Sequence, residues 1–390
     1  MSTENILVCG TGIVGLATAL GLTKAGQQVT LLGPREGVPP ARGEEYCPRV
    51  YALSPSSQRF LEHLGVWGML DASRLAPVED MEVYGDASGR VVLRAWQAAV
   101  SRLATIIESS ELERVLQQAV KVFGIAWRDE KFRGLEGGVA VTESGARIEA
   151  DLLVGADGAG SLVRAAAGIH HESRSYHSTG LVVHLTAQRA HQGVAFQWFT
   201  SDGVLALLPM PDTSQGRQVS MVWSMPEDQA ADLLAMDDEA RRTALGLRLQ
   251  AATAGRLGTL TVRSALVGFP LFLEKSGVVG PGVALVGDAA HRVHPLAGQG
   301  LNLGLADVEQ LVEVVRGRES FRKAGDLRVL RRYRRARAES VLAMSVATDG
   351  LQRLFLSQAA PVVLARNVGM QVVDRLPGLK RFLIGGASGG

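Results

Sequence analysis

The feature that most constrains the fold is a glycine-rich turn near the start of the chain. An apolar run at residues 5–9 leads directly into Gly10-x-Gly12-x-x-Gly15, and a helical pattern follows at residues 16–25. Gly26 is predicted as the helix C-cap, and residues 28–32 read as a second strand. In this context the glycines allow a tight turn, close approach of a pyrophosphate and close helix packing. An ordinary glycine-rich turn is the alternative, but the flanking elements favour a dinucleotide site.

A second nucleotide signal lies three quarters of the way along the chain. An apolar strand runs into Gly287-Asp288, and after a turn containing Pro295 a Gly298-x-Gly300 sequence opens a helix. This order predicts a carboxylate at a strand end, followed by helix N–H groups directed at an anion. The two signals together predict one large cofactor that is bound from both ends of the sequence.

Two further positions bear on this cofactor site. The apolar run at residues 150–158 ends in Asp157-Gly158, and a helix starts close to Ser161; taken alone, this pattern is more typical of a β-turn. An acidic residue that binds the ribose is expected at the end of the second strand, but Gly33 stands there. Glu36 is the nearest carboxylate that can reach back, so the adenosine end is expected to be held differently.

Composition excludes several classes of protein. At 390 residues the chain is long enough for one large domain or two intertwined domains. A net charge of +2 gives no reason to expect nucleic acid as a partner. Two cysteines, Cys9 and Cys47, form neither a disulfide framework nor a metal-binding spacing, which fits a reducing cytosol. No run approaches the roughly 18 apolar residues of a membrane-spanning helix, and the chain enters its first strand too early for a signal peptide.

Three motifs in this order, Gly10-x-Gly12-x-x-Gly15, Asp157-Gly158 and Gly287-Asp288, resemble the group A flavoprotein aromatic hydroxylases, whose prototype is para-hydroxybenzoate hydroxylase. Other segments are similar to the subfamily of hydroxylases of ubiquinone biosynthesis, and together they span nearly the whole chain: 49–54, 64–67, 196–199, 202–203, 205–209, 219–224, 269–271 and 348–351. The chain departs from the pattern at Cys47, where Asp is expected, and at Ser109 and Ser110, where an Asn-Arg pair is common.

The resemblance implies an α/β fold. A Rossmann-like FAD-binding domain of the glutathione-reductase type would contain an inserted β-sheet substrate domain and be followed by a C-terminal helical segment. The implied boundaries are 1–75, 100–175 and 270–330 for the discontinuous FAD-binding domain, 76–99 and 176–269 for the substrate sheet, and 331–390 for the C-terminal helices. An inserted helix is predicted at residues 237–254.

The resemblance also implies roles for individual residues. Asp288 would anchor the ribityl chain or ribose, the helix after Gly298 would meet the flavin pyrimidine edge, and the Pro295 carbonyl would orient substrate at the reacting face. No catalytic acid or base is assigned. The implied cofactor-binding residues are Gly10, Gly12, Ile13, Val14, Gly15, Arg49, Asp157, Gly158, Gly287, Asp288, Pro295, Gly298, Gly300, Leu301 and Asn302.

The implied activity is a monooxygenation. NAD(P)H would reduce FAD, the reduced flavin and O2 would form a hydroperoxide, and its distal oxygen would hydroxylate the ring of a polyprenylated phenol or quinol. Other ubiquinone-biosynthesis proteins are implied as partners, and the oligomeric state stays open. Two alternatives remain: another FAD enzyme of the same fold, such as a halogenase or prenyl reductase, and a flavin-free scaffold protein.

Several side chains have two readings. His291 and His294 flank the Asp288 turn, but no third ligand follows at metal spacing, so turn histidines satisfied by the backbone are favoured and no metal is predicted. His170 and His171 are predicted in a surface loop. Arg49 is a candidate flavin or substrate contact, with a surface salt bridge as the alternative.

The C-terminal segment has a basic run and an apolar stripe. The run is predicted as a solvated helix face, with contact to anionic lipid or a partner as the alternative; it comprises Arg328, Arg331, Arg332, Arg334, Arg335 and Arg337. The stripe comprises Leu351, Leu354, Phe355, Leu356, Val362, Val363 and Leu364. A cytoplasmic protein is expected, with peripheral docking on the inner face of the membrane as a hypothesis, because a polyprenyl substrate resides there.

Overall fold

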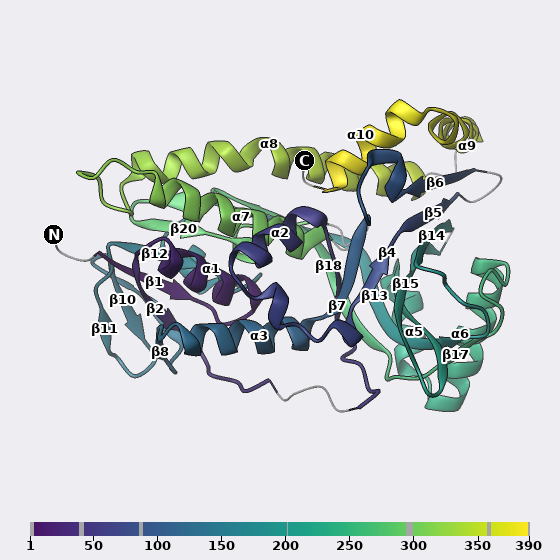
Figure 1. The fold of residues 1–390 in the computed structure, drawn as a ribbon, viewed down its shortest axis with the longest axis horizontal. Coiled ribbons are helices and arrows are strands. Elements are labelled where there is room, and N and C mark those ends of the chain that lie inside the picture. Colours follow the sequence, from purple (N-terminus) through teal and green to yellow (C-terminus); the bar gives the residue numbers. More distant parts are fainter. Residues whose placement is uncertain are drawn as a thin grey trace.

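The computed structural model describes residues 4–38, 43–85, 89–200, 202–293, 299–356 and 360–388. Within these residues two sheets lie side by side, and long helices line one flank of the molecule (Figure 1). A six-stranded sheet has the order β19-β20-β12-β1-β2-β8, parallel except for β19. Its strands are β1 (Asn5–Cys9), β2 (Gln28–Leu32), β8 (Ala126–Arg128), β12 (Leu152–Gly155), β19 (Val279–Gly280) and β20 (Val283–Leu285).

The central strand β1 is buried on both faces, as its continuous apolar run predicts. Ile6 and Val8 point toward the helices α1 (Ile13–Lys24), α3 (Ser109–Val122) and α7 (Gln299–Arg316). Leu7 and Cys9 point toward a small antiparallel sheet on the opposite face. That sheet consists of β9 (Phe132–Glu136), β10 (Val139–Thr142) and β11 (Arg147–Ile148).

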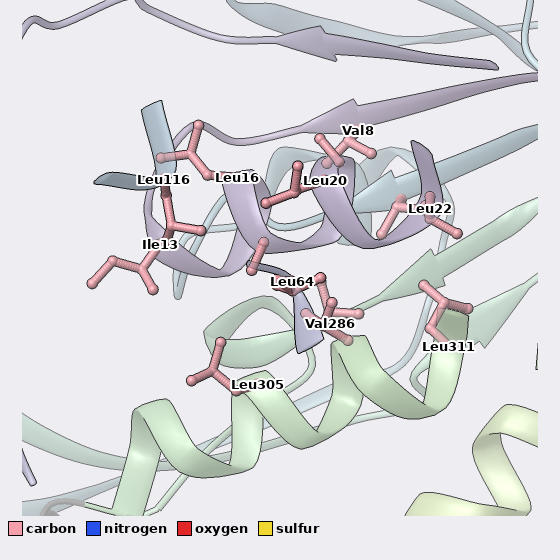
Figure 2. Packing of buried hydrophobic residues seen from close by; sticks show 14 of the residues in the cluster. Val8, Ile13, Leu16, Leu20, Leu22, Leu64, Leu116, Val286, Leu305 and Leu311 are labelled. Carbon is pink, nitrogen blue, oxygen red and sulfur yellow. The ribbon is translucent and has the colours of Figure 1, made fainter. Parts of the chain in front are cut away.

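Helix α1 is enclosed by its neighbours, because it is apolar around nearly its whole circumference. Leu16 and Leu20 of α1 lie among side chains of the sheet and of α7, including Val8, Val286 and Leu305 (Figure 2). The strand–turn–helix–strand prediction is confirmed: both strands have the predicted bounds, although the helix begins three residues earlier. Gly26 lies just beyond the C-cap, with a φ of +82°, and ends the helix as a Schellman motif.

The second large sheet has nine strands in the order β21-β18-β13-β16-β15-β14-β5-β6, with β17 also paired to β13. The strands are β5 (Asp80–Tyr84), β6 (Arg90–Arg94), β13 (His171–Ala187), β14 (Val194–Thr200), β15 (Gly203–Thr213), β16 (Gly216–Pro226), β17 (Leu260–Val262), β18 (Val267–Ser276) and β21 (His291–Arg292). One face is covered by α5 (Glu227–Ala235) and α6 (Asp238–Thr253). The predicted inserted helix is confirmed, since Asp237 caps α6 and Ala254 ends it in a left-handed conformation.

The remaining elements connect these bodies. A three-stranded sheet of β3 (Val50–Leu53), β4 (Ala76–Val78) and β7 (Ala104–Glu108) lies between the two large sheets. The shorter helices are α2 (Pro55–His63) and α4 (Leu162–Ala166), and the 3-10 turns are η1 (Trp67–Met69), η2 (Ala72–Arg74), η3 (Ala95–Ala98) and η4 (Gly287–Ala289). The C-terminal helices are α8 (Leu327–Leu356), α9 (Ala360–Arg375) and α10 (Pro377–Ser388).

The strand pairings cross one of the predicted domain boundaries. Strand β18 pairs with β13 in the nine-stranded sheet, although most of it falls in the segment 270–330 that was predicted for the FAD-binding domain. His171 begins β13 and is half-buried, so its prediction as a surface-loop residue is wrong, whereas His170 is exposed as predicted. The division into domains stays a prediction.

Candidate cofactor site

The three glycines of the first motif have three different surroundings. A Cβ atom at Gly10, whose φ is +115°, would lie 2.1 Å from the Ala156 carbonyl oxygen. A Cβ atom at Gly15 would lie 2.0 Å from the Gly10 carbonyl oxygen. A Cβ atom at Gly12 would meet nothing within 4 Å. Gly10 and Gly15 therefore close the turn tightly, while Gly12 leaves open space where a ligand can approach the backbone.

The start of α1 is free to bind an anion. Gly12 is the N-cap residue, no side chain caps the helix, and its first turn holds no acidic residue. The first N–H groups of a helix lack intrahelical partners and lie at the positive end of its dipole. A pyrophosphate fits this position. The Ile13 side chain is buried in the core, so at this position only the backbone is available to a ligand.

The Gly287-Asp288 turn follows β20 and exposes one carboxylate. Gly287 has a φ of +59° and is buried, as is Ala289, whereas Asp288 between them is exposed. The rigid flanks hold this carboxylate at the surface of the turn. Burial raises the pKa of the nearby Tyr51 to about 12; the Arg49 cation opposes this shift, and the Asp288 carboxylate adds to it.

Three segments that are far apart in the sequence meet around the Val14 side chain. A Cβ atom at Gly287 would lie 3.1 Å from Val14 Cγ1, and one at Gly304 would lie 3.0 Å from Val14 Cγ2 and 3.2 Å from Gly287 Cα. The first turn of α1, the Asp288 turn and the start of α7 are thereby packed against one another. Gly304 was missed by sequence reasoning, because a glycine inside a helix does not by itself reveal what packs against it.

The start of α7 offers backbone rather than side chains. A Cβ at Gly300 would meet nothing within 4 Å, and Leu301 is buried. The Asn302 amide is engaged inside the protein: its oxygen accepts from Ser54 N at 2.9 Å and Ser57 Oγ at 2.8 Å, and its nitrogen donates to Ala52 O at 2.9 Å. Asn302 therefore ties α7 to the start of α2. The predicted residues Pro295 and Gly298, and His294 between η4 and α7, lie outside the described residues.

Asp157 acts as a cap for α4. Its Oδ1 accepts from Ser161 Oγ at 2.6 Å, and its Oδ2 accepts from Val163 N at 3.1 Å. Gly158 follows with a φ of +81°, and Ser161 is the helix N-cap as predicted. Burial raises the pKa of the Cys9 thiol, and the Asp157 charge adds to this shift. The Asp157-Gly158 turn thus lies directly at the end of β1, beside the glycine-rich turn.

The segment before Arg49 is hydrogen-bonded to a buried ion pair. Arg49 is exposed, and its guanidinium lies 5.2 Å from the centre of the Tyr51 ring. The Cys47 amide donates to Glu108, which is paired with Arg74 at 2.6 Å. Sequence reasoning did not find the Glu108–Arg74 pair, because its partners belong to different elements.

The end of β2 explains the missing carboxylate. Gly33 has a φ of +149°, and a Cβ atom there would lie 2.8 Å from Thr11 Cγ2. Arg35, two residues on, lies over the Trp127 ring at 5.0 Å. A side chain at position 33 is therefore sterically and conformationally disfavoured.

The His291 ring is paired with a side chain, a contact that the prediction of a histidine satisfied by the backbone does not include. It is buried in β21, and its Nε2 lies 2.7 Å from the carboxylate oxygen Oδ2 of Asp307 in α7. Burial by itself lowers the pKa of His291, but the charge of Asp307 and its hydrogen bond to the ring together outweigh burial, and the pKa is raised. Among the residues that the structure describes, no group of three potential ligands could hold a metal ion.

The nine-stranded sheet turns one face toward this site. The pairings Val182↔Val222, Val222↔Ala206 and Ala206↔Gln197 place three apolar side chains and one amide side by side. This face lies opposite the α5–α6 core, and His184 on it contacts the Cys47 carbonyl at 2.8 Å through Nε2. Burial lowers the pKa of His184, so the ring is neutral and donates to that carbonyl. Ala206 and Val222 are only half-buried, so part of each side chain on this face is accessible.

Comparison with known proteins identifies the family of this chain. A family model described as an FAD binding domain matches residues 3–345, so the chain belongs to this FAD-binding family. Ubiquinone hydroxylase UbiL of Rhodospirillum rubrum is 32% identical over 99% of this chain and 89% of that protein. The 3-demethoxyubiquinol 3-hydroxylase of Escherichia coli is 32% identical over 96% of each chain. The resemblance inferred from the motifs is confirmed.

Solved structures show the same fold. The p-nitrophenol 4-monooxygenase PnpA of Pseudomonas putida has a TM-score of 0.76 at 17% identity, covering 99% of this chain and 98% of that one. The flavin-dependent brominase Bmp2 also has a TM-score of 0.76, at 14% identity, covering 99% and 93%. The predicted α/β fold with an FAD-binding domain is therefore confirmed, and these distant structures bear on the fold alone.

Proposed function

We propose that this protein is an FAD-dependent aromatic monooxygenase that hydroxylates the ring of a polyprenylated phenol or quinol in ubiquinone biosynthesis, with NAD(P)H as electron donor and O2 as oxidant. The observation that carries the proposal is the packing of three backbone elements around Val14, beside the nine-stranded sheet, whose edge strand β21 contacts the Asp288 turn. The names of relatives that align over nearly the whole chain support the substrate class.

Each element has a distinct task in this reaction. The N–H groups at the start of α1 would hold the FAD pyrophosphate, and the exposed Asp288 carboxylate would accept hydrogen bonds from the polyol chain. The backbone at the start of α7, open at Gly300, would stabilise negative charge at the flavin edge. When bound, FAD supplies the redox and oxygen chemistry.

The sheet face supplies the substrate side. Val182, Ala206 and Val222 form an apolar surface that suits an aromatic ring and keeps water from the reacting atoms. Gln197, which is buried beside Ala206, offers an amide for orienting a ring hydroxyl. None of these side chains acts as an acid or base, so positioning and exclusion of water are the contributions of the protein.

The test has two stages. The purified protein should bind FAD, as seen in its visible absorption spectrum, and should oxidise NADH or NADPH faster when a prenylated phenol is present. Mass spectrometry should find one atom from isotope-labelled O2 in the product. A protein that binds no FAD even on reconstitution would overturn every enzymatic reading. Bound FAD with a halogenated product would favour the halogenase alternative. The brominase Bmp2 has the same fold, so this alternative is included in the test.

The C-terminal helices provide a surface for membrane contact. Arg331, Arg335, Leu342 and Val346 lie on one face of α8 at helical spacing, and all are exposed. Further exposed apolar residues are Val368 and Val372 on α9, Leu376 between α9 and α10, and Leu383 on α10. No helix in the described part of the chain is both long and apolar enough to cross a membrane. We propose that these exposed arginines and apolar side chains dock on an anionic lipid surface, where a polyprenyl substrate resides.

Parts of the predicted basic run and apolar stripe do not face this surface. Arg332 pairs with Glu319 and Arg337 with Asp307, so the run is not one solvated face. Leu354 is exposed, whereas the side chains of Leu351, Phe355, Leu356, Val362, Val363 and Leu364 lie outside those described.

Vesicle flotation tests the docking. At low salt the protein should float with vesicles that contain phosphatidylglycerol, and less with phosphatidylcholine alone. The Leu342→Glu/Val346→Glu variant should float less, whereas Leu247→Glu, at an exposed leucine on α6, should behave as the native protein does. Equal flotation of all three proteins would contradict docking through α8.

A further inference from the structure

A buried carboxylate in α7 joins the cofactor turn to the C-terminal helix α8. The Gly287 amide donates to Asp307 Oδ2 at 3.0 Å, and Arg337 Nε donates to Asp307 Oδ1 at 2.7 Å. His291 Nε2 lies 2.7 Å from the same Oδ2. Asp307 is fully buried, and the side chain of Arg337 is 11% exposed. A buried carboxylate with this many charged and amide donors is held in one position.

Helix α8 is itself fixed against the sheet. The Tyr333 hydroxyl, one turn before Arg337 on the same face, donates to Leu285 O at 2.8 Å in the strand that leads into the turn. Arg337 also donates to Leu303 O at 3.3 Å, near the start of α7. Strand β20, the turn at Gly287 and the start of α7 are thus all tied to α8.

The Asp307 contact reaches the residue beside the exposed carboxylate. Gly287 has a left-handed φ, and no side chain caps the η4 turn from within. The hydrogen bond to Asp307 is therefore a constraint on this amide that comes from another element. Its geometry sets where the neighbouring Asp288 carboxylate projects.

We propose that Asp307 and Arg337 are positioning residues for FAD: Arg337 holds Asp307, and Asp307 holds the Gly287 amide so that Asp288 faces the cofactor. Neither residue contacts FAD itself. The inference rests on the proposed FAD site, and it assigns to α8 a part in cofactor binding that the glycine motifs do not contain.

Titration of the apo-protein with FAD, followed by quenching of flavin fluorescence, tests the proposal. Asp307→Asn and Arg337→Gln should each raise the dissociation constant at least about tenfold, the effect of losing one charge-assisted hydrogen bond. Arg337→Lys should restore most of the affinity, because it keeps the charge. Arg334→Gln, the same substitution at an exposed position on the same helix, should leave the affinity unchanged.

A stability control separates positioning from general weakening of the fold. Leu311→Ala removes a buried side chain from α7 without touching the turn, so it should lower the unfolding midpoint and keep FAD affinity. At saturating FAD, the visible circular dichroism of the flavin should change in Arg337→Gln and not in Leu311→Ala. If Asp307→Asn does not fold, the FAD affinities of Arg337→Gln and Arg337→Lys still test the proposal.

The outcomes are distinguishable from failure of the proposed function. If the native protein binds no FAD, the FAD site itself is wrong. If the native protein binds FAD and Arg337→Gln binds it equally well with the same circular dichroism, only the positioning role is overturned. Parallel losses of affinity in Leu311→Ala and Arg337→Gln would also overturn it, because stability alone would then explain the loss.

Discussion

At the scale of single residues, two glycines of the first motif are required by the packing of the turn, and the third leaves space for a ligand. Gly10 and Gly15 have carbonyl oxygens where a Cβ atom would be, whereas Gly12 faces open space. The sequence predicts all three as cofactor residues, yet the structure gives two of them a steric reason that holds without any ligand. Substitutions at these positions should therefore have different consequences.

Gly12→Ala and Gly15→Ala should differ in what they damage. Gly15→Ala should lower the free energy of unfolding by about 1–3 kcal/mol, because its methyl group collides with backbone. Gly12→Ala should change apo-protein stability by less than about 1 kcal/mol but weaken FAD binding about tenfold or more, since the methyl group occupies the space of the pyrophosphate. Chemical denaturation and FAD titration measure the two effects. A stability loss that is equal in both variants would contradict the assignment.

Gly33→Glu tests the adenosine end. A glutamate here would supply the carboxylate expected for a ribose, but the φ of +149° and the 2.8 Å contact with Thr11 oppose any side chain. We expect the variant to lose about 1–3 kcal/mol of stability without tighter FAD binding. Calorimetric titration of FAD would check this, and improved affinity at unchanged stability would show that the backbone here relaxes.

At the scale of elements, the start of α4 is closed by side chains of the turn that precedes it. Asp157 Oδ2 accepts from the Val163 amide in the first turn of α4, and Asp157 Oδ1 accepts from the hydroxyl of Ser161, the N-cap residue. Arg164 of α4 in turn donates to Ala289 O at 2.9 Å, which links this short helix to the Asp288 turn. The resemblance implies a cofactor contact for Asp157, and the capping contacts give it a second role.

Asp157→Asn separates these roles. If capping dominates, the variant and Ser161→Ala should each lose about 0.5–2 kcal/mol of unfolding free energy, with little change in FAD affinity. Thermal denaturation and FAD titration of both variants would measure this. Weaker FAD binding in Asp157→Asn alone would instead support the direct cofactor contact that the resemblance implies.

The ion pair between β21 and α7 predicts a pH dependence. The pKa of His291 is raised in the folded protein, so its contribution to stability is complete below the unfolded value of about 6.5 and is lost as the pH rises through the folded value. The pKa of Asp307 is lowered despite its burial, because His291 and Arg337 are close, so its contribution is lost only as the pH falls below about 4.

The stability difference between the native protein and His291→Gln should therefore shrink as the pH rises from about 6 toward 9, by about 1.4 kcal/mol for each unit by which the pKa is raised. Urea denaturation across this range would measure it. A difference that is constant with pH would mean that the pKa of His291 is the same in the folded and unfolded states, and a difference that grows with pH would mean that folding lowers it.

At the scale of the whole molecule, α9 closes the open edge of the nine-stranded sheet. Asn367 accepts from Gly89 N at 2.9 Å, and Asp374 accepts from Val92 N at 2.9 Å on the edge strand β6. Met370 and Val373 pack against Val91 and its neighbours. Exposed strand edges invite pairing with another chain, and this helix covers one.

A chain truncated before α9 should therefore associate through β6. Size-exclusion chromatography with light scattering should find larger species for the truncated protein than for the full chain at the same concentration. Asp374→Ala, which removes one edge contact and leaves α9 in place, is the milder control. A truncated protein with unchanged mass and solubility would show that the exposed edge of β6 does not cause association.

The sequence by itself determined the local units and their order. Glycines that need a special φ, apolar runs and helix caps act within about 30 residues, so the strand–turn–helix–strand unit, helix α6 and the motif order could be predicted. The tertiary structure alone decided which side chains meet. Asn302 accepts a hydrogen bond from Ser54, which is 248 residues away in the sequence. Asp307 of α7 accepts one from Arg337 of α8, and Gly287 and Gly304 both pack against Val14. Such contacts depend on how separate elements pack, and no local pattern in one sequence encodes that.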